Sequence, residues 1–166
     1  MRPRGVEQFK FEHPMKTTKR YGRKADLALS MWVKLARAHD TFEHRTAENI
    51  RSFGLTPPQF GALECLGHLG PMKIGELTKK QLVSGGNMTV VIDNLEKDGL
   101  VQRTVKSTDR RSVQVSLTAK GRRLFERIFA EHAAYVAQLA SALTEQEQTA
   151  LADLLRKLGC ALAKSA

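Results

Sequence analysis

The sequence predicts a mostly α-helical α+β fold: a winged helix-turn-helix lobe with a two-stranded β wing, flanked by N- and C-terminal helices. Two short helical segments follow each other between Ile74 and Gly99, which is the arrangement of a helix-turn-helix. Directly after them the hydrophobic pattern changes from the period of a helix to that of a strand, which predicts a hairpin. Long amphipathic segments lie towards both ends of the chain and supply the flanking helices.

The length and the charge of the chain limit what it can be. Its 166 residues suffice for one ordinary domain with a helical appendage. Lys and Arg number 27 against 17 Asp and Glu, a formal net charge of +10, which indicates a polyanionic partner, with nucleic acid the leading candidate. A basic surface that only keeps the protein in solution is the alternative. No run approaches the roughly 18 apolar residues of a membrane span, so we expect a cytoplasmic protein without a membrane partner.

The reactive side chains indicate neither a metal nor an enzyme. Cys65 and Cys160 lie outside any CxxC spacing, which argues against a disulfide framework and a thiolate zinc site. The five histidines contain no HxxxH pair, and the chain has no GxSxG, HExxH, P-loop or GxGxxG motif. We therefore expect no metal, no cofactor and no catalytic residue.

The N-terminal part divides into an arm and a helix. Residues 1–25 hold eight Lys or Arg against two Glu and show no apolar period, which predicts a flexible basic arm. Residues 26–55 carry an apolar stripe that includes Leu27, Met31 and Leu35, which predicts a first long helix.

The winged helix-turn-helix lobe is predicted at residues 56–118. Thr56 and Gln59 have the spacing of a capping box, which starts the next helix. A short helix is expected from Ile74, and Ser84 is expected to cap a second one. That second helix has a narrow apolar stripe, which consists of Met88, Val91, Ile92 and Leu95.

Turn and capping residues predict the rest of the chain. Gly99 stands where a helix C′ glycine is expected. Apolar residues then alternate on both sides of the polar loop 106–111, which predicts a hairpin with a basic tip. Thr118 is expected to cap the first of two C-terminal helices in residues 119–166, and Thr144 with Glu147 forms a capping box for the second.

The second short helix has the features of a DNA-recognition helix. Its apolar stripe docks on the lobe, so the opposite face is left to read bases in the major groove, and its glycine-rich entry lets backbone N–H groups approach a phosphate. Asparagine can read adenine, and methyl groups can contact thymine. An ordinary solvated helix face is the alternative. The candidate DNA-binding residues are Ser84, Gly86, Asn87, Thr89, Val90 and Asn94.

The hairpin tip supports the DNA-binding interpretation. Arg110 and Arg111 on an exposed turn are suited to the minor groove, whose narrow A·T stretches concentrate negative potential. Asp109 can hold a neighbouring guanidinium in a defined direction. An ordinary surface turn is the alternative.

Several stretches closely resemble the recognition helix and wing of the MarR family. They are Leu55–Phe60, Ser84–Thr89, Asp93–Val101, Asp109–Arg111 and Leu117–Gly121, in the order found in that family. The resemblance covers roughly residues 26–163. It implies a homodimer, formed by the first helix and the two C-terminal helices, that binds a palindromic double-stranded operator as a transcriptional repressor. It also implies that Arg110 enters the minor groove and that Arg111 lies near phosphate.

The resemblance implies release of DNA by a small effector as well. Members of the family commonly bind aromatic or phenolic acids in a cleft between the dimer helices and the DNA-binding lobe. The candidate lining residues are Trp32, Leu35, His39 and Phe42 on the first helix, with Phe60, Glu64 and His68 on the second. Ordinary core or interhelix packing is the alternative for each of them.

Two other functions stay open. Cys65 could serve as a redox switch, although its apolar helix with an acidic neighbour favours an inert thiol. Winged helices also serve as protein-interaction modules without DNA binding. The basic wing and the basic start of the fifth helix argue against that use, since a protein-binding module has no need of them.

Overall fold

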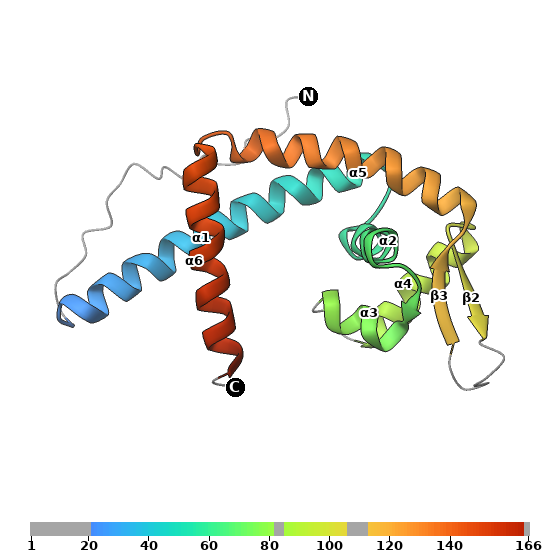
Figure 1. Cartoon of the computed structure of the whole chain (residues 1–166), viewed down its shortest axis with the longest axis horizontal. Helices are drawn as coiled ribbons and strands as arrows, with labels where there is room; N and C mark the ends of the chain where they lie inside the picture. The colour runs from blue at the N-terminus through green and yellow to red at the C-terminus, as the bar shows by residue number, and fades with distance from the viewer. Residues whose placement is uncertain (1–20, 82–84, 106–112, 165–166) are drawn as a thin grey trace, which may run out of the picture. The chain divides into compact units, whose positions relative to one another are not determined.

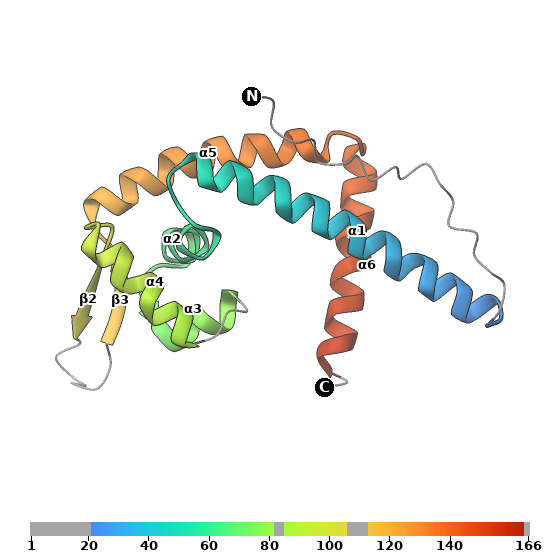
Figure 2. The same cartoon turned by 180° about the vertical axis from the view of Figure 1, so that it is seen from behind.

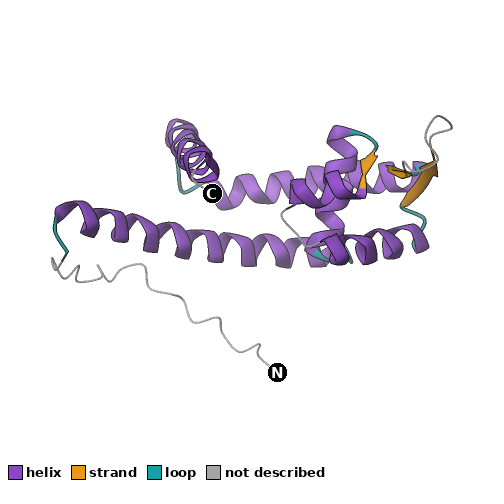
Figure 3. Cartoon of the chain, turned by 90° about the horizontal axis from the view of Figure 1, so that it is seen from below, coloured by secondary structure: helices purple, strands orange, loops and turns teal. Residues whose placement is uncertain are grey.

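The computed structural model describes residues 21–81, 85–105 and 113–164. The chain divides into two compact units, Met1–Glu43 and His44–Ala166. The first helix, α1 (Arg23–Ser52), runs through the boundary between them. Among the described residues, six helices and a small antiparallel sheet confirm the predicted fold class, and Figure 3 shows the strands gathered at one place in a largely helical chain.

The start of α1 corrects the boundary predicted for the basic arm. The arm was expected to extend to residue 25, but the helix begins at Arg23. Arg, Lys and Ala are good helix formers. Arg23 and Lys24 are exposed, so this turn needs no apolar period to be helical. The remainder of the predicted arm, residues 1–20, lies outside the described residues.

The second unit contains the winged helix-turn-helix lobe (Figures 1 and 2). Helices α2, α3 and α4 pack on one another, and α5 packs on α2. The sheet has the strand order β1-β3-β2, so β2 lies at an edge. The elements of the lobe are α2 (Pro57–Leu69), β1 (Met72–Lys73), α3 (Ile74–Gln81), α4 (Gly85–Lys97), β2 (Val101–Val105) and β3 (Val113–Leu117).

Local hydrogen bonds set the ends of α2 and α4. The Thr56 backbone N–H donates to the Gln59 side chain at 2.9 Å, and the Gln59 N–H donates to the Thr56 hydroxyl at 3.4 Å, which confirms the predicted capping box. Gly99 has a φ of 69°, which favours glycine. The N–H groups of Gly99 and Leu100 donate back into the last turn of α4, each at 2.9 Å, which forms a Schellman motif. The predicted end of this helix is confirmed.

The wing is paired as the alternating pattern predicted, but the sheet has a third strand. In the β2–β3 pair, Val101 lies opposite Leu117 and Val105 opposite Val113. The third strand, β1, places Met72 opposite Val115 on the other side of β3. A strand of two residues is too short to show an alternating period, so the sequence pattern did not reveal it.

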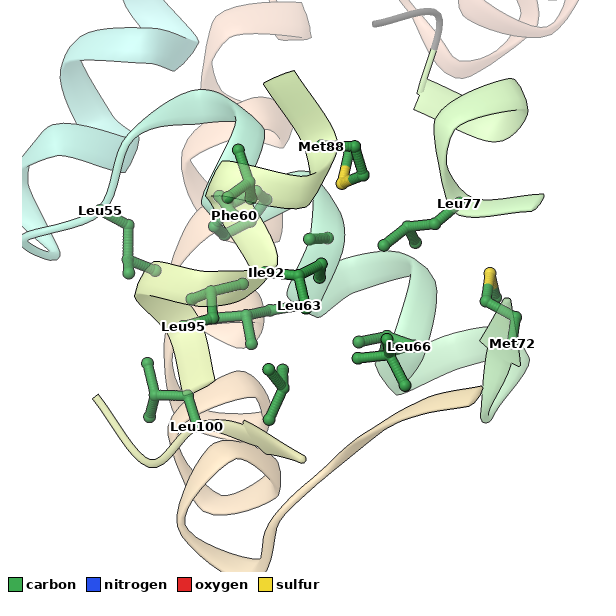
Figure 4. Close-up of a cluster of buried hydrophobic side chains, with 14 of the residues drawn as sticks. Leu55, Phe60, Leu63, Leu66, Met72, Leu77, Met88, Ile92, Leu95 and Leu100 are labelled. Carbon is green, nitrogen blue, oxygen red and sulfur yellow. The ribbon is translucent and has the colours of Figure 1, made fainter. Parts of the chain in front are cut away.

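The hydrophobic core joins α4 to the other elements of the lobe (Figure 4). The predicted stripe of α4 is confirmed, because Met88, Ile92 and Leu95 are fully buried and Val91 is 6% exposed. These side chains belong to one cluster with buried residues of α2, α3 and the sheet, among them Leu63, Leu66, Leu77, Val101 and Val115. Burial of each such side chain stabilises the fold by about 1.5–3 kcal/mol, so α4 is held firmly on the lobe.

The two C-terminal helices differ in burial. Helix α5 (Ala119–Ala140) is capped by Thr118, whose hydroxyl accepts from the Gly121 N–H at 3.0 Å, and it buries Phe125 and Ile128. Helix α6 (Glu145–Lys164) begins at the predicted Thr144 capping box but has no buried residue. Four of its leucines, Leu151, Leu154, Leu155 and Leu162, are exposed in the single chain.

Candidate nucleic-acid interface

Helix α4 presents a polar face opposite its buried stripe. Asn87, Thr89 and Asn94 are exposed, and Val90 is 55% exposed. Because the buried stripe determines the rotation of the helix, these side chains point away from the lobe core. This is the face that the sequence predicted to read bases.

The start of α4 is also suited to an anion. Gly86 lies in its first turn, which contains no acidic residue. The positive end of the helix dipole is therefore not compensated by a carboxylate in that turn. Ser84, the predicted N-cap, lies outside the described residues.

The predicted wing residues Asp109, Arg110 and Arg111 also lie outside the described residues. The strands that carry their loop are described, and Val113 at the start of β3 is 37% exposed.

An ion-pair cluster connects β2 to α4. The Arg103 guanidinium contacts the Asp93 carboxylate at 2.6 Å and also the Glu96 carboxylate, and the Arg103 backbone N–H donates to Glu96 at 3.0 Å. Partial burial by itself lowers the pKa of Arg103, but its hydrogen bonds and attraction to the two carboxylates outweigh this effect and raise it. The guanidinium therefore stays charged. Sequence reasoning missed this cluster, although two acidic residues one turn apart followed by an arginine in the next strand were a usable signal.

The basic start of α5 lies at the end of β3 that joins this helix. Arg122, Arg123 and Arg127 are exposed on this helix, and the Lys120 ammonium donates to the Asp98 carbonyl at 2.7 Å. Because α5 follows β3 directly, these side chains lie at the base of the hairpin. A five-residue strand, roughly 17 Å long, separates them from Val113 at the other end of β3.

The candidate effector residues are divided between the two units. Trp32, Leu35, His39 and Phe42 belong to the first unit, and Trp32 is 61% exposed. Phe60, Glu64 and His68 belong to α2 in the second unit, where Phe60 is buried. The cleft that they were expected to line stays a prediction.

Within the second unit, the α2 residues adjoin an aromatic cluster that sequence reasoning missed. One ring nitrogen of His132 on α5 shares a hydrogen bond of 2.8 Å with the Asn49 side chain, and the His132 ring lies 4.6 Å from that of Phe60. His68 contacts Phe125 and Phe129 edge-on, at ring distances of 5.1 and 4.5 Å. Burial lowers the pKa of His132, and the charge of Glu64 opposes this effect. Partial burial therefore favours the neutral form of this histidine.

The two cysteines have different surroundings. Cys65 is half-buried against the core cluster, with the Gln81 amide nitrogen 3.9 Å from its sulfur. Cys160 is exposed on α6.

Among the helices in the described ranges, none is both long and apolar enough to cross a membrane.

Comparison with known proteins identifies the family. The model of the MarR family matches residues 55–113. The HTH-type transcriptional regulator MhqR of Bacillus subtilis (strain 168) is 33% identical over 132 residues, which cover 80% of this chain and 91% of MhqR. The chain belongs to the MarR family.

Solved structures of similar proteins agree with this assignment. A MarR family protein from Bacillus stearothermophilus has a TM-score of 0.70 and 25% identity, covering 86% of this chain and 99% of that one. NadR, crystallised in complex with 4-hydroxyphenylacetate, has a TM-score of 0.65 and 26% identity, covering 76% of this chain and 89% of that one. The fold and the family are therefore those predicted from the sequence.

Proposed function

We propose that the protein is a non-enzymatic, sequence-specific transcriptional repressor that binds a palindromic DNA operator as a homodimer and releases it when an aromatic or phenolic acid binds. The observation that carries the proposal is the orientation of α4, whose apolar stripe is buried while Asn87, Val90 and Asn94 face outward. A helix of this kind fits a major groove about 12 Å wide. A dimer seated on a promoter would exclude the transcription machinery, and it would act in the cytoplasm, where the DNA is.

Each DNA-reading element has its own role in the proposal. In the major groove, Asn87 and Asn94 hydrogen-bond to base edges, while Val90 and the Thr89 methyl contact thymine methyl groups. Ser84 and Gly86 let the start of α4 approach a phosphate. In the minor groove, Arg110 reads the negative potential of an A·T stretch, oriented by Asp109, and Arg111 contacts phosphate.

The exposed apolar side chains of α6 support the homodimer. Leu151 is 45% exposed, Leu154 64% and Leu162 62%. Contiguous apolar surface of this kind is normally covered by a partner, and a second copy related by a twofold axis provides the same surface to both chains. The two recognition helices then read half-sites about 34 Å apart.

The proposed effector is an aromatic or phenolic acid. Support comes from NadR, whose crystal structure contains 4-hydroxyphenylacetate. In this chain the α2 residues Phe60, Glu64 and His68, together with the α1 residues Trp32, Leu35, His39 and Phe42, are the candidates for binding it.

The test is the selection of bound duplexes from a random pool, followed by affinity measurements on the selected sequence. We expect a palindromic sequence, and an affinity that falls steeply with salt because each neutralised phosphate contributes a slope near 0.9 in log–log form. An affinity that does not change with salt would favour the protein-interaction module instead. Repeating the measurement with a panel of phenolic acids tests the effector.

A further inference from the structure

Arg103 joins the wing to the recognition helix by three polar contacts. Its guanidinium contacts Asp93 at 2.6 Å and also Glu96, and its backbone N–H donates to Glu96 at 3.0 Å. Asp93 and Glu96 lie three residues apart and therefore face the same side of α4. Two carboxylates from one helix face hold the planar guanidinium at both ends of its fork. A shift of β2 along α4, or a rotation of the hairpin about it, strains all three contacts.

The surroundings of Arg103 distinguish this cluster from an ordinary surface ion pair. The Arg103 side chain is 26% exposed, and those of its partners Asp93 and Glu96 are 56% and 38% exposed. In the Arg156–Asp153 pair on α6 the side chains are 77% and 66% exposed. Exposed pairs are screened by water and contribute little. β2 is an edge strand, and Glu96 accepts the N–H of its middle residue, a group that edge strands otherwise leave unpaired. The backbone of the wing is thus bonded directly to α4.

The position of the cluster connects it to the DNA-reading face. Asp93 lies three residues after Val90 and directly before Asn94, so it borders the outward face of α4. A bare carboxylate there would repel phosphate. Arg103 can therefore act in two ways, by orienting the hairpin or by compensating the negative charge of Asp93 and Glu96.

We infer that Arg103 is a positioning residue that fixes the β2–β3 hairpin on the recognition helix, so that the two elements enter adjoining grooves as one rigid unit. This inference rests on the proposed DNA-binding function. The rigid connection reduces the conformational freedom that the hairpin would otherwise lose on binding DNA. It also makes binding of the hairpin in the minor groove depend on binding of α4 in the major groove.

The experiment uses the full chain and a duplex selected from a random pool by the unsubstituted protein. Dimethyl sulfate methylates guanine in the major groove and adenine in the minor groove, so one footprint reports both elements. Arg103→Ala is expected to keep the guanine protection but to lose the adenine protection. The unsubstituted protein is expected to bind the selected duplex more tightly than a duplex with altered base pairs at the minor-groove contact. Arg103→Ala is expected to reduce this ratio of affinities about tenfold, the usual effect of one base pair.

A second variant separates orientation from charge. Asp93→Ala with Glu96→Ala removes both partners of Arg103 and raises the net charge by two, whereas Arg103→Ala lowers it by one. If Arg103 orients the hairpin, both variants lose the minor-groove protection despite their opposite charge changes. Arg156→Ala, which breaks the exposed pair on α6, is the matched control and is expected to leave the footprint unchanged.

Three results with the variants overturn the inference. Unchanged adenine protection in both variants shows that the cluster does not orient the hairpin. Equal loss in both grooves with a lowered melting temperature shows that Arg103 only supports the fold. If one variant binds every duplex more weakly and the other binds every duplex more tightly, only the charge of the cluster matters. If the unsubstituted protein selects no duplex at all, the proposed function fails and the inference fails with it.

Discussion

The backbone of α5 approaches the turn after α4 so closely that position 121 accepts only glycine. A Cβ atom added to Gly121 would lie 1.9 Å from the carbonyl oxygen of Leu100. That oxygen also accepts the Thr118 N–H at 3.0 Å, so it cannot move without breaking a backbone hydrogen bond. One glycine therefore determines how α5 joins the lobe.

We expect Gly121→Ala to destabilise the protein by about 1–3 kcal/mol, the usual cost of overpacking. The free energy of unfolding in urea measures the effect. Gly75→Ala in α3 is the matched control, because a Cβ there meets no atom within 4 Å, and it is expected to leave stability unchanged or slightly raised. Equal stability of both variants would contradict the close approach.

His132 predicts a pH dependence of stability. Its pKa is lowered in the folded chain by burial, below the 6.5 of a free histidine. The unfolded chain therefore binds the proton more readily, so the contribution of the neutral ring is complete above pH 6.5 and is lost as the pH falls through this value towards the folded pKa.

Melting temperatures measured between pH 7.5 and 5.5 test this pH dependence. The melting temperature is expected to fall more for the unsubstituted protein than for His132→Gln as the pH is lowered. His39→Gln, at an exposed position of the other unit, is the control. A fall of the same size with and without His132 would show that this histidine does not contribute.

Cys65 is expected to be a packing residue. It is half-buried against the core beside Gln81, and serine has nearly the same size. Cys65→Ser is therefore expected to leave DNA affinity and the response to peroxide unchanged in a binding assay. A variant that no longer releases DNA on oxidation would establish the redox switch instead.

At the scale of elements, α4 illustrates how burial of one helix face orients the opposite face. Ile92 is fully buried, whereas Val90, two residues earlier, is 55% exposed. Ile92→Ala is expected to cost about 2–5 kcal/mol because it leaves a cavity in the core. Val90→Ala is expected to change stability by less than about 0.5 kcal/mol but to weaken DNA binding. Urea unfolding and duplex affinity measure the two effects, and a Val90→Ala protein with both properties unchanged would contradict the reading face.

The elements that the sequence predicted are those with a local cause. The stripe of α4, the capping residues Thr56 and Thr118, and Gly99 each act within a few residues of themselves, so the pattern alone located the helices. Strand β1 was missed because its pairing with β3 joins residues far apart in the sequence. The same reason applies to the Arg103 cluster and to the contact between His132 and Asn49. The candidate base-reading residues follow from the period of one helix, whereas the effector cleft requires several elements and was predicted only from family resemblance.

At the scale of the whole molecule, the exposed leucines of α6 predict that the single chain is not the functional unit. Leu154 is 64% exposed and Leu162 62%. Leu154→Lys with Leu162→Lys places two charges on this surface, and burying unpaired charges in an interface is strongly unfavourable. Sedimentation equilibrium is expected to show a dimer for the unsubstituted protein and a monomer for the variant.

Loss of the dimer should also lower the affinity for the full palindrome without changing how one chain binds its half-site. A monomer keeps α4 and the hairpin but binds only one half-site at a time. In a dimer, binding of the first half-site raises the effective concentration at the second. The affinity of the monomer for the full palindrome is therefore expected to be lower by about 10²-fold or more. Leu69→Lys, at a leucine that is 59% exposed on α2, adds charge outside α6 and is the matched control. A doubly substituted protein that still sediments as a dimer and binds the full palindrome as before would mean that the copies associate through another surface, and α6 would then need a different partner.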